Sequence, residues 1–401
     1  MGKALAILAV ATEVLVAAGL VVLASAGVTK AEIVTRNAAG GPNPYFFVQR
    51  QAIWLAIAFV LALAAGWFDY RKWRSVKWLA PAFFAVTSVL LAVTVLPKIF
   101  TSLEVPLRPL TRSINGSYRW LDFGPIRLQP GELAKLAVVI CLSVWLDKIG
   151  NRVQSLVKGV LYTASIIVPT LALLVLEPDF GSAMVVCVLS FALMFYSGVR
   201  FLHLAGLGLS ISLPIMCMIA LNDNRRQRLL AWLAGNENGG LEAKTQSVYQ
   251  LKQAMCAIGN GGLSGRGFGE SMQRYGYLPE AHTDFIFAIG AEEWGMWFSI
   301  GTIALFAVWT AAGVYIATRA ADRLGRLLAF GMTYLVGFQA AFNISVVCGT
   351  VPTKGLALPF MSYGGTNLMT ALIATAIIFN VGLRSARQSA AARNAATFTR
   401  L

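Results

Sequence analysis

Long apolar runs alternate with shorter polar segments along almost the whole chain. A helix needs about 20 mostly apolar residues to cross a bilayer. Runs close to or above that length occupy 4–27, 51–68, 78–97, 132–147, 156–176, 180–198, 201–221, 285–316, 327–348 and 366–383. This pattern predicts an all-α fold, that of a polytopic integral membrane protein with about ten transmembrane helices in a single domain over residues 1–384.

The distribution of basic residues predicts the orientation of these helices. Short polar segments rich in Lys and Arg lie at 71–77, 148–158 and 319–326, and more basic residues follow position 383. Because short cytoplasmic loops carry an excess of Lys and Arg, we expect both termini in the cytoplasm, with 385–401 as a disordered basic tail. The remaining long segments are then extracytoplasmic, the largest of them joining helices seven and eight: 98–131, 222–284 and 349–365.

The composition supports a membrane protein and excludes several other classes. Hydrophobic residues make up 57% of the 401 residues and charged residues only 13%, about half the share typical of soluble domains. The formal net charge is +15, but the basic residues form short clusters between apolar runs. We interpret them as topology signals and as contacts with anionic membrane lipid, and expect no nucleic-acid binding. The five cysteines show no CxxC spacing, so neither a zinc site nor a disulfide framework is predicted.

A polar stretch at 277–285, YLPEAHTDF, directly precedes the apolar run that starts at Phe285. Thr283 or Asp284 can cap the helix that begins there, and Asp284 would lie at the positive end of the helix dipole. For an isolated Asp, a helix cap is the simpler interpretation. The neighbouring segments favour a functional role instead.

The first extracytoplasmic segment carries three candidate residues. Arg119 beside Trp120 is either an interfacial anchor or a phosphate ligand. Pro130 suits the first turn of a helix, which places Glu132 and Lys135 one turn apart on a shared face. An ion pair there avoids a lone charge in hydrocarbon, and it either locks two helices together or contacts a substrate.

The other two segments add further cations. Residues 259–269 contain six glycines and Arg266, which favours either a phosphate cradle or a flexible re-entrant turn. The segment at 349–365 supplies Lys354 and Ser362. One carboxylate among several cations on one membrane face suits a base that activates a hydroxyl beside a bound pyrophosphate. If the pyrophosphate is the leaving group, its negative charge needs neutralising and it needs no proton. The second carboxylate, which glycosidases use to protonate the leaving group, is then dispensable.

The motifs of these segments resemble those of the SEDS family (shape, elongation, division and sporulation) of peptidoglycan glycosyltransferases. The resemblance covers nearly the whole chain and extends to the order and spacing of NGSYRWLDFG, QPGELAKL, EPDFGSA, GNGGLSGRGFG, YLPEAHTDF and PTKGLALPFMSYGG. The last two motifs resemble the cell-division branch more than the elongation branch. Departures from the family pattern are modest and lie at Gly131, Glu177 and Thr366.

The resemblance implies an inner-membrane enzyme that polymerises lipid II into glycan strands during septal cell-wall synthesis. Its implied partners are a class B penicillin-binding protein transpeptidase and other divisome proteins. Asp284 falls on the family's catalytic position, Glu132 and Lys135 on its paired cavity charges, and Lys354 on a further functional position. The candidate substrate-binding set is Arg119, Glu132, Lys135, Arg266, Lys354 and Ser362.

As a hypothesis, Asp284 takes the proton of the acceptor's 4-hydroxyl while Arg119, Lys354 and Arg266 hold the donor's pyrophosphate, with inversion at the anomeric carbon. No resident cofactor or metal site is predicted, although a divalent cation bridging Asp284 and pyrophosphate stays open. The alternatives are an elongation polymerase, a lipid II flippase and a non-catalytic division scaffold. The few charges within the predicted spans weigh against a flippase.

Overall fold

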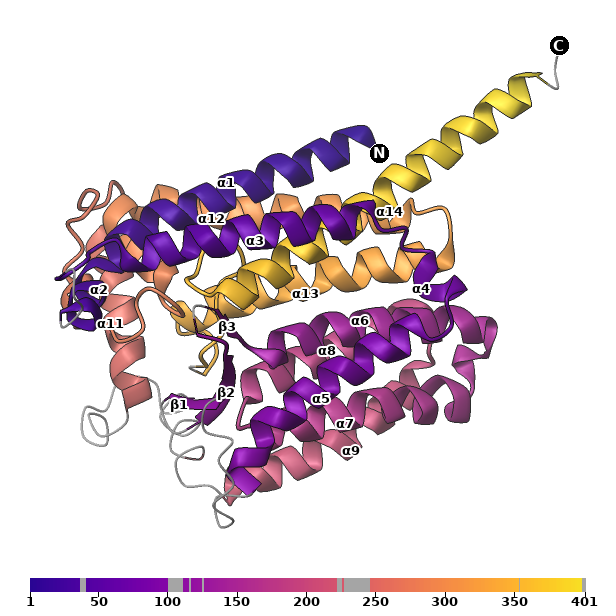
Figure 1. Cartoon of the computed structure of the whole chain (residues 1–401), viewed down its shortest axis with the longest axis horizontal. Helices are drawn as coiled ribbons and strands as arrows, with labels where there is room; N and C mark the ends of the chain where they lie inside the picture. Colours follow the sequence, from indigo (N-terminus) through magenta and orange to yellow (C-terminus); the bar gives the residue numbers. More distant parts are fainter. Residues whose placement is uncertain are drawn as a thin grey trace.

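The computed structural model describes residues 1–36, 41–99, 111–114, 117–124, 126–221, 226, 246–352 and 354–398. Long helices dominate these ranges and run side by side as a bundle (Figure 1), which confirms the predicted all-α membrane fold. Buried apolar side chains from nearly all of these helices form one large core.

Eight helices of the described residues are long and apolar enough to cross a membrane. They are α1 (Gly2–Ala26), α3 (Phe46–Trp67), α5 (Leu79–Ile99), α7 (Tyr162–Leu176) with the preceding π-helix η2 (Leu156–Leu161), α8 (Phe180–Ser197), α12 (Ile286–Thr318), α13 (Arg323–Val347) and α14 (Gly365–Phe398). The two other predicted positions hold α6 (Pro130–Ile149) and α9 (Phe201–Ala220), each 20 residues long. Charged residues at both ends of α6 lower its hydropathy. The count of ten spans stays a prediction.

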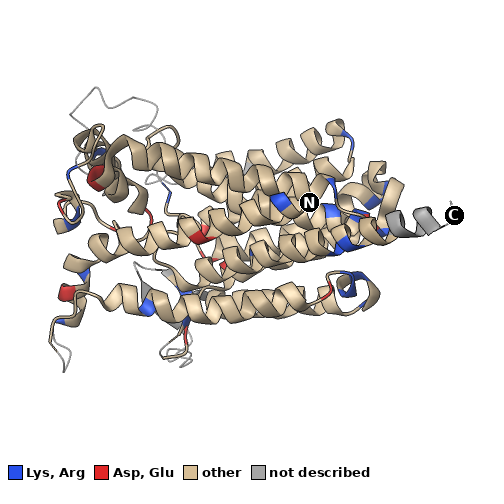
Figure 2. Ribbon diagram, turned by 90° about the horizontal axis from the view of Figure 1, so that it is seen from above, with Lys and Arg blue, Asp and Glu red and all other residues tan. Residues whose placement is uncertain are grey.

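The described parts of the segments predicted to be extracytoplasmic gather at one end of the bundle (Figure 1). That end carries α2 (Val28–Thr35), α11 (Gln246–Gly261) and a small sheet, whereas α4 (Lys72–Ser75) and both chain termini lie toward the opposite end. Figure 2 shows Lys and Arg mostly near the two ends, with few charged residues along the helices between them. This arrangement fits a bundle that crosses a bilayer along its helix axes.

The segment at 98–131, predicted to be extracytoplasmic, contains an antiparallel sheet that the apolar pattern did not predict. Its strands are β1 (Thr111–Ile114), β2 (Ser117–Asp122) and β3 (Arg127–Leu128), in the order β1-β2-β3. Arg112 pairs with Trp120, and Leu121 pairs with Leu128. The sequence places Asn-Gly between the first two strands, a pair typical of two-residue hairpin turns. That signal could have predicted the hairpin.

Helix α12 is two helices joined at Gly295, where φ is 72° and ψ is −159°. A Cβ atom on Gly295 would lie 2.4 Å from the amide nitrogen of Gly265, so only glycine fits at the kink. The amide of Met296 donates to the Gly262 carbonyl across the same contact, at 2.9 Å. The glycine-rich segment therefore packs backbone against backbone on the broken helix.

Helix α14 continues to Phe398, where the sequence predicted a disordered tail from residue 385. Ser385 is buried, and its Oγ accepts a hydrogen bond from the Ala321 amide at 3.1 Å. The sequence beyond it is rich in Ala and Arg, both strong helix formers. The described part of this segment is thus helical.

Candidate functional site

Asp284 lies in the loop that leads into α12, at the end of the bundle that carries α2, α11 and the small sheet. The helix begins at Ile286, and its N-cap residue is Phe285, without a side-chain capping bond. The predicted cap by Thr283 or Asp284 is therefore wrong. The hydroxyl of Thr283 donates instead to the carbonyl and to Oε2 of Glu280, each at 3.2 Å.

The loop is shaped by a turn at Glu280, whose φ of 56° lies in the left-handed region. The Glu280 carbonyl accepts the amides of Thr283 and Asp284 at 3.2 Å. Its side chain forms an ion pair with Lys30 of α2, with 2.9 Å between Oε1 and Nζ. These contacts tie the Asp284 loop to α2.

Helix α13 fastens the Asp284 loop to the segment at 349–365. The side-chain nitrogen Nδ2 of Asn343 donates to the carbonyl of Asp284 at 2.8 Å and to that of Leu356 at 2.5 Å. The Asp284 carboxylate also lies against the backbone of Gly355, where an added Cβ would come within 2.6 Å of Oδ2. Asn343 and Gly355 are site residues that the sequence analysis missed. The one available signal in the sequence was Asn343, a polar residue within an apolar run.

The electrostatic environment of Asp284 makes it a weak acid that can serve as a base. Burial raises the pKa of this half-buried carboxyl to about 7, and the charge of Glu280 raises it further, whereas Arg119 and Lys30 lower it. A base with a pKa near the working pH combines a sizeable ionised fraction with strong proton affinity. Asp284 thus has the properties of a general base.

His282 has a packing role rather than an acid–base role. Its ring packs against those of Phe47 and Tyr363, with centroids 4.5 Å and 5.8 Å away, and those two rings also contact each other at 4.8 Å. Burial, aided by the charge of Lys30, lowers the pKa of His282 to about 4. The imidazole is therefore neutral at pH 7.

Two predicted cations lie in the same region as Asp284. Arg119 projects from β2, its Nη2 donates to the Pro178 carbonyl at 2.6 Å, and its charge acts on Asp284. Lys354 precedes Gly355, and its Nζ lies 4.9 Å from the centre of the Phe180 ring at the start of α8. The segment at 98–131, the Asp284 loop and the segment at 349–365 therefore converge here.

Asp179 is a second carboxylate at this junction that the sequence analysis did not single out. Its side chain caps α8 by accepting the Ser182 amide at 3.2 Å and the Ser182 hydroxyl at 2.8 Å, and it also accepts Nε2 of Gln129 at 3.1 Å. Its charge raises the pKa of Asp284. The Asp-x-x-Ser spacing before an apolar run was the available signal.

Arg266 is engaged elsewhere. Its guanidinium pairs with the buried Glu292 of α12, with 3.5 Å between Nη1 and Oε1. The amides of Arg266 and Gly267 donate to the carbonyls of Glu292 and Glu293 at 3.0 and 2.9 Å. Because these two amides already donate to carbonyls of the protein, they cannot also bind a phosphate. This contradicts the phosphate-cradle interpretation for them. No contact among the described residues joins Arg266 to Asp284.

The predicted pair of Glu132 and Lys135 is confirmed. Both side chains are buried, with 2.7 Å between Oε1 and Nζ. Lys135 also donates to Oε1 of Gln339 at 2.9 Å, and Gln339 donates to the Ala357 carbonyl at 2.9 Å. The pair is therefore linked through α13 to the segment at 349–365. Its contact with substrate stays a prediction.

Ser362 is also placed by the structure. Its hydroxyl is buried and accepts the Leu358 amide at 2.8 Å, and its carbonyl accepts Nε2 of Gln51 at 3.1 Å. Both contacts organise the loop itself. The predicted substrate contact of Ser362 has no further support from the described residues.

Comparison with known proteins places this arrangement in a family. Residues 5–387 match the FtsW, RodA and SpoVE family of cell cycle proteins. The probable peptidoglycan glycosyltransferase FtsW of Geobacter metallireducens is 36% identical over 341 residues, 85% of this chain and 86% of that protein. The protein of the same name from Coxiella burnetii is 33% identical over 375 residues, 93% and 94% of the two chains.

Solved structures agree with the fold. A chain of a peptidoglycan synthase complex that coordinates polymerization and crosslinking superposes with a TM-score of 0.69 at 27% identity, covering 92% of this chain and 97% of that chain. The rod shape determining protein RodA of Thermus thermophilus superposes with a TM-score of 0.64 at 26% identity, covering 94% and 95%. The chain therefore belongs to the FtsW, RodA and SpoVE family of cell cycle proteins.

Proposed function

We propose that this protein is a peptidoglycan glycosyltransferase that polymerises lipid II into glycan strands at the division septum of a bacterial inner membrane. The observation that carries the proposal is the position of Asp284. This carboxyl, with a pKa raised to about 7, lies where three extracytoplasmic segments converge and where Arg119 and Lys354 supply positive charge. The relatives named probable peptidoglycan glycosyltransferase FtsW support the same activity.

One general base beside several cations suits a glycosyl transfer in which pyrophosphate leaves. The 4-hydroxyl oxygen of the acceptor sugar attacks the anomeric carbon of the donor, and Asp284 takes the hydroxyl proton. The bond between the anomeric carbon and the pyrophosphate oxygen breaks, and the pyrophosphate leaves with the electron pair. Arg119 and Lys354 stabilise the charge on the leaving group. A direct displacement of this kind inverts the anomeric carbon.

The surrounding charges support an enzyme better than a flippase. A flippase needs polar groups along a path across the bilayer, whereas the buried charges described here are paired or hydrogen-bonded in place. Glu132 pairs with Lys135, Glu292 accepts the Ser271 hydroxyl at 2.5 Å, and Glu293 accepts the hydroxyl of Ser25. These contacts hold helices and loops together.

We also propose that the protein works with a class B penicillin-binding protein and other divisome proteins. The similar chain from a complex that coordinates polymerization and crosslinking supports a crosslinking partner. Peptidoglycan strands must be crosslinked after polymerisation, so a transpeptidase held at the exit of the glycan strand would act on the product directly.

The test of the proposal is the variant Asp284→Asn. Asparagine keeps the size of the side chain but cannot accept the proton, and a positioned general base contributes about 10²–10⁴-fold in rate. We expect strand synthesis from labelled lipid II by the purified complex with its transpeptidase to fall by that factor, while complex formation survives. Asp122→Asn is the matched control, because Asp122 is an extracytoplasmic carboxylate paired with Arg127 at 3.3 Å.

Two outcomes would contradict the proposal. If Asp284→Asn synthesised strands at the rate of the control, Asp284 would not be the base. Transport of lipid II across vesicle membranes by the wild-type complex, without strand synthesis, would make the protein a flippase.

A further inference from the structure

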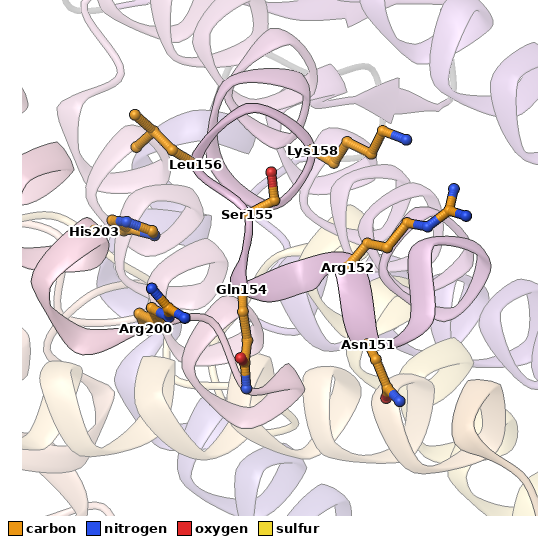
Figure 3. A pocket seen from close by; sticks show the side chains of 8 residues that line it. All are labelled: Asn151, Arg152, Gln154, Ser155, Leu156, Lys158, Arg200 and His203. Carbon is orange, nitrogen blue, oxygen red and sulfur yellow. The ribbon is translucent and has the colours of Figure 1, made fainter.

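A basic pocket lies at the end of the bundle opposite to Asp284. It forms where the connection between α6 and α7, including the 3-10 helix η1 (Gly150–Gln154), meets the junction of α8 and α9, and its volume is about 610 Å³. Its lining residues are Asn151, Arg152, Gln154, Ser155, Leu156, Lys158, Arg200 and His203. Figure 3 shows Arg152 and Lys158 on one side, Arg200 and His203 on the other, and Gln154 and Ser155 between them.

The lining residues of the basic pocket suit an anion with several oxygen atoms. Arg152, Lys158 and Arg200 are exposed cations, and none of the eight lining residues is acidic. None of the three forms an ion pair with a described residue. Nδ1 of His203 is buried and has no hydrogen-bond partner among the described residues. Charged donors of this kind form strong hydrogen bonds to phosphate oxygens.

The position of the basic pocket places that anion in the headgroup layer of the membrane. Candidate spans begin at Leu156 and end at Ser197, so the pocket lies at the boundary of the apolar region. Apolar side chains beside it are exposed by 57% at Leu161, 73% at Phe201 and 83% at Leu202. A free phosphate would not use such a surface, whereas acyl chains would cover it.

We propose that the basic pocket binds the phosphodiester headgroup of an anionic phospholipid such as phosphatidylglycerol. The phosphate contacts Arg152, Lys158 and Arg200, and the acyl chains lie along Leu161 and Phe201. The basic pocket is at the end of the bundle with both chain termini, which the basic loops predict to be cytoplasmic, so the lipid comes from the inner leaflet. This site is separate from the extracytoplasmic chemistry at Asp284.

The test compares two triple variants of the full-length protein. The first, Arg152→Gln with Lys158→Gln and Arg200→Gln, removes the cations of the basic pocket. The control, Lys77→Gln with Arg319→Gln and Arg387→Gln, removes one exposed lysine and two exposed arginines from the same end outside the pocket. The probe is phosphatidylglycerol with a fluorescent acyl chain, titrated into each protein in a neutral detergent.

We expect the pocket variant to bind phosphatidylglycerol about 10- to 100-fold more weakly than wild type, and the control to stay within about 2-fold. Equal weakening in both variants would show binding to general surface charge and overturn the proposal. Equal binding of zwitterionic phosphatidylcholine would do the same. Displacement of the probe by inorganic phosphate as readily as by unlabelled phosphatidylglycerol would identify a phosphate site and exclude the lipid. The single variant Arg200→Gln, expected to lose about 5-fold, serves if the triple variant does not fold.

Discussion

The Asp284 carboxylate and the backbone of Gly355 are in direct contact, so that a Cβ atom on Gly355 would lie 2.6 Å from Oδ2 of Asp284. The substitution Gly355→Ala must therefore displace the carboxylate. A displacement of about 1 Å in a reacting group can lower a rate by about 100-fold. We expect Gly355→Ala to lower strand synthesis by about 10- to 100-fold without loss of folded protein, measured with labelled lipid II and by thermal unfolding.

Gly364→Ala is the control for this prediction. Gly364 also lies in the segment at 349–365, but its added Cβ would meet Asn367 at 3.6 Å, an ordinary van der Waals contact. It should therefore keep the activity of the wild type within about 2-fold. Full activity of Gly355→Ala would mean that the Asp284 carboxylate works from another position.

The raised pKa of Asp284 predicts the pH dependence of activity. A base with a pKa of about 7 is protonated below that pH, so strand synthesis should fall about tenfold per pH unit on the acid side. Glu280 contributes to the raised pKa through its negative charge. The variant Glu280→Gln should therefore shift the acid limb to lower pH, as measured by initial rates between pH 5 and pH 9. An unshifted limb would contradict this electrostatic assignment.

The same pKa shift predicts a pH-dependent stability. The folded-state pKa is about 7 against an ordinary value of 3.8, so the protonated carboxyl is the form that the folded protein favours. The contribution to stability is fully present below the ordinary pKa and is lost as the pH rises through 7. Asp284→Asn is neutral at every pH. Its melting temperature in detergent should therefore rise relative to wild type between pH 4 and pH 8.

The helices could be predicted from the sequence because their signals are local. The apolar run at 180–198 becomes α8, Phe180–Ser197, since its length and composition suffice. The kink at Gly295 could not be predicted, because an isolated glycine is tolerated in a helix and the break depends on packing by Gly262 and Gly265. The helical end of α14 was missed for a similar reason, since Ser385 is held by a distant backbone group.

The same difference between local signals and long-range contacts applies to the candidate site. Glu132 and Lys135 could be paired from sequence, because residues three apart meet on one face of a helix. The ion pair of Arg266 with Glu292 and the bridge of Asn343 between two loops join segments distant along the chain. A single sequence does not indicate which of several polar residues such segments bring together.

Single-cysteine labelling can test the orientation of the bundle. Ser264 is exposed in the glycine-rich segment and Lys77 is exposed at the opposite end, beside α4. In a variant without the five native cysteines, we expect Ser264→Cys to react with a membrane-impermeant maleimide added outside intact cells, and Lys77→Cys to react only after the membrane is opened. Labelling of Lys77→Cys in intact cells would invert the topology and place the basic pocket in the outer leaflet.

The buried pair of Glu132 and Lys135 should behave as a coupled unit. Removing one partner leaves an uncompensated buried charge, which typically costs about 3–5 kcal/mol, whereas replacing both by neutral residues of similar size is often close to neutral. We therefore expect Glu132→Gln and Lys135→Met each to lower the melting temperature in detergent strongly, and the double variant to recover most of the loss. Lys135 also donates to Gln339 at 2.9 Å, so the recovery should be incomplete. A double variant no more stable than either single variant would show that pairing is not what holds these charges in the fold. If stability recovers but strand synthesis does not, the pair acts on substrate as well as on structure.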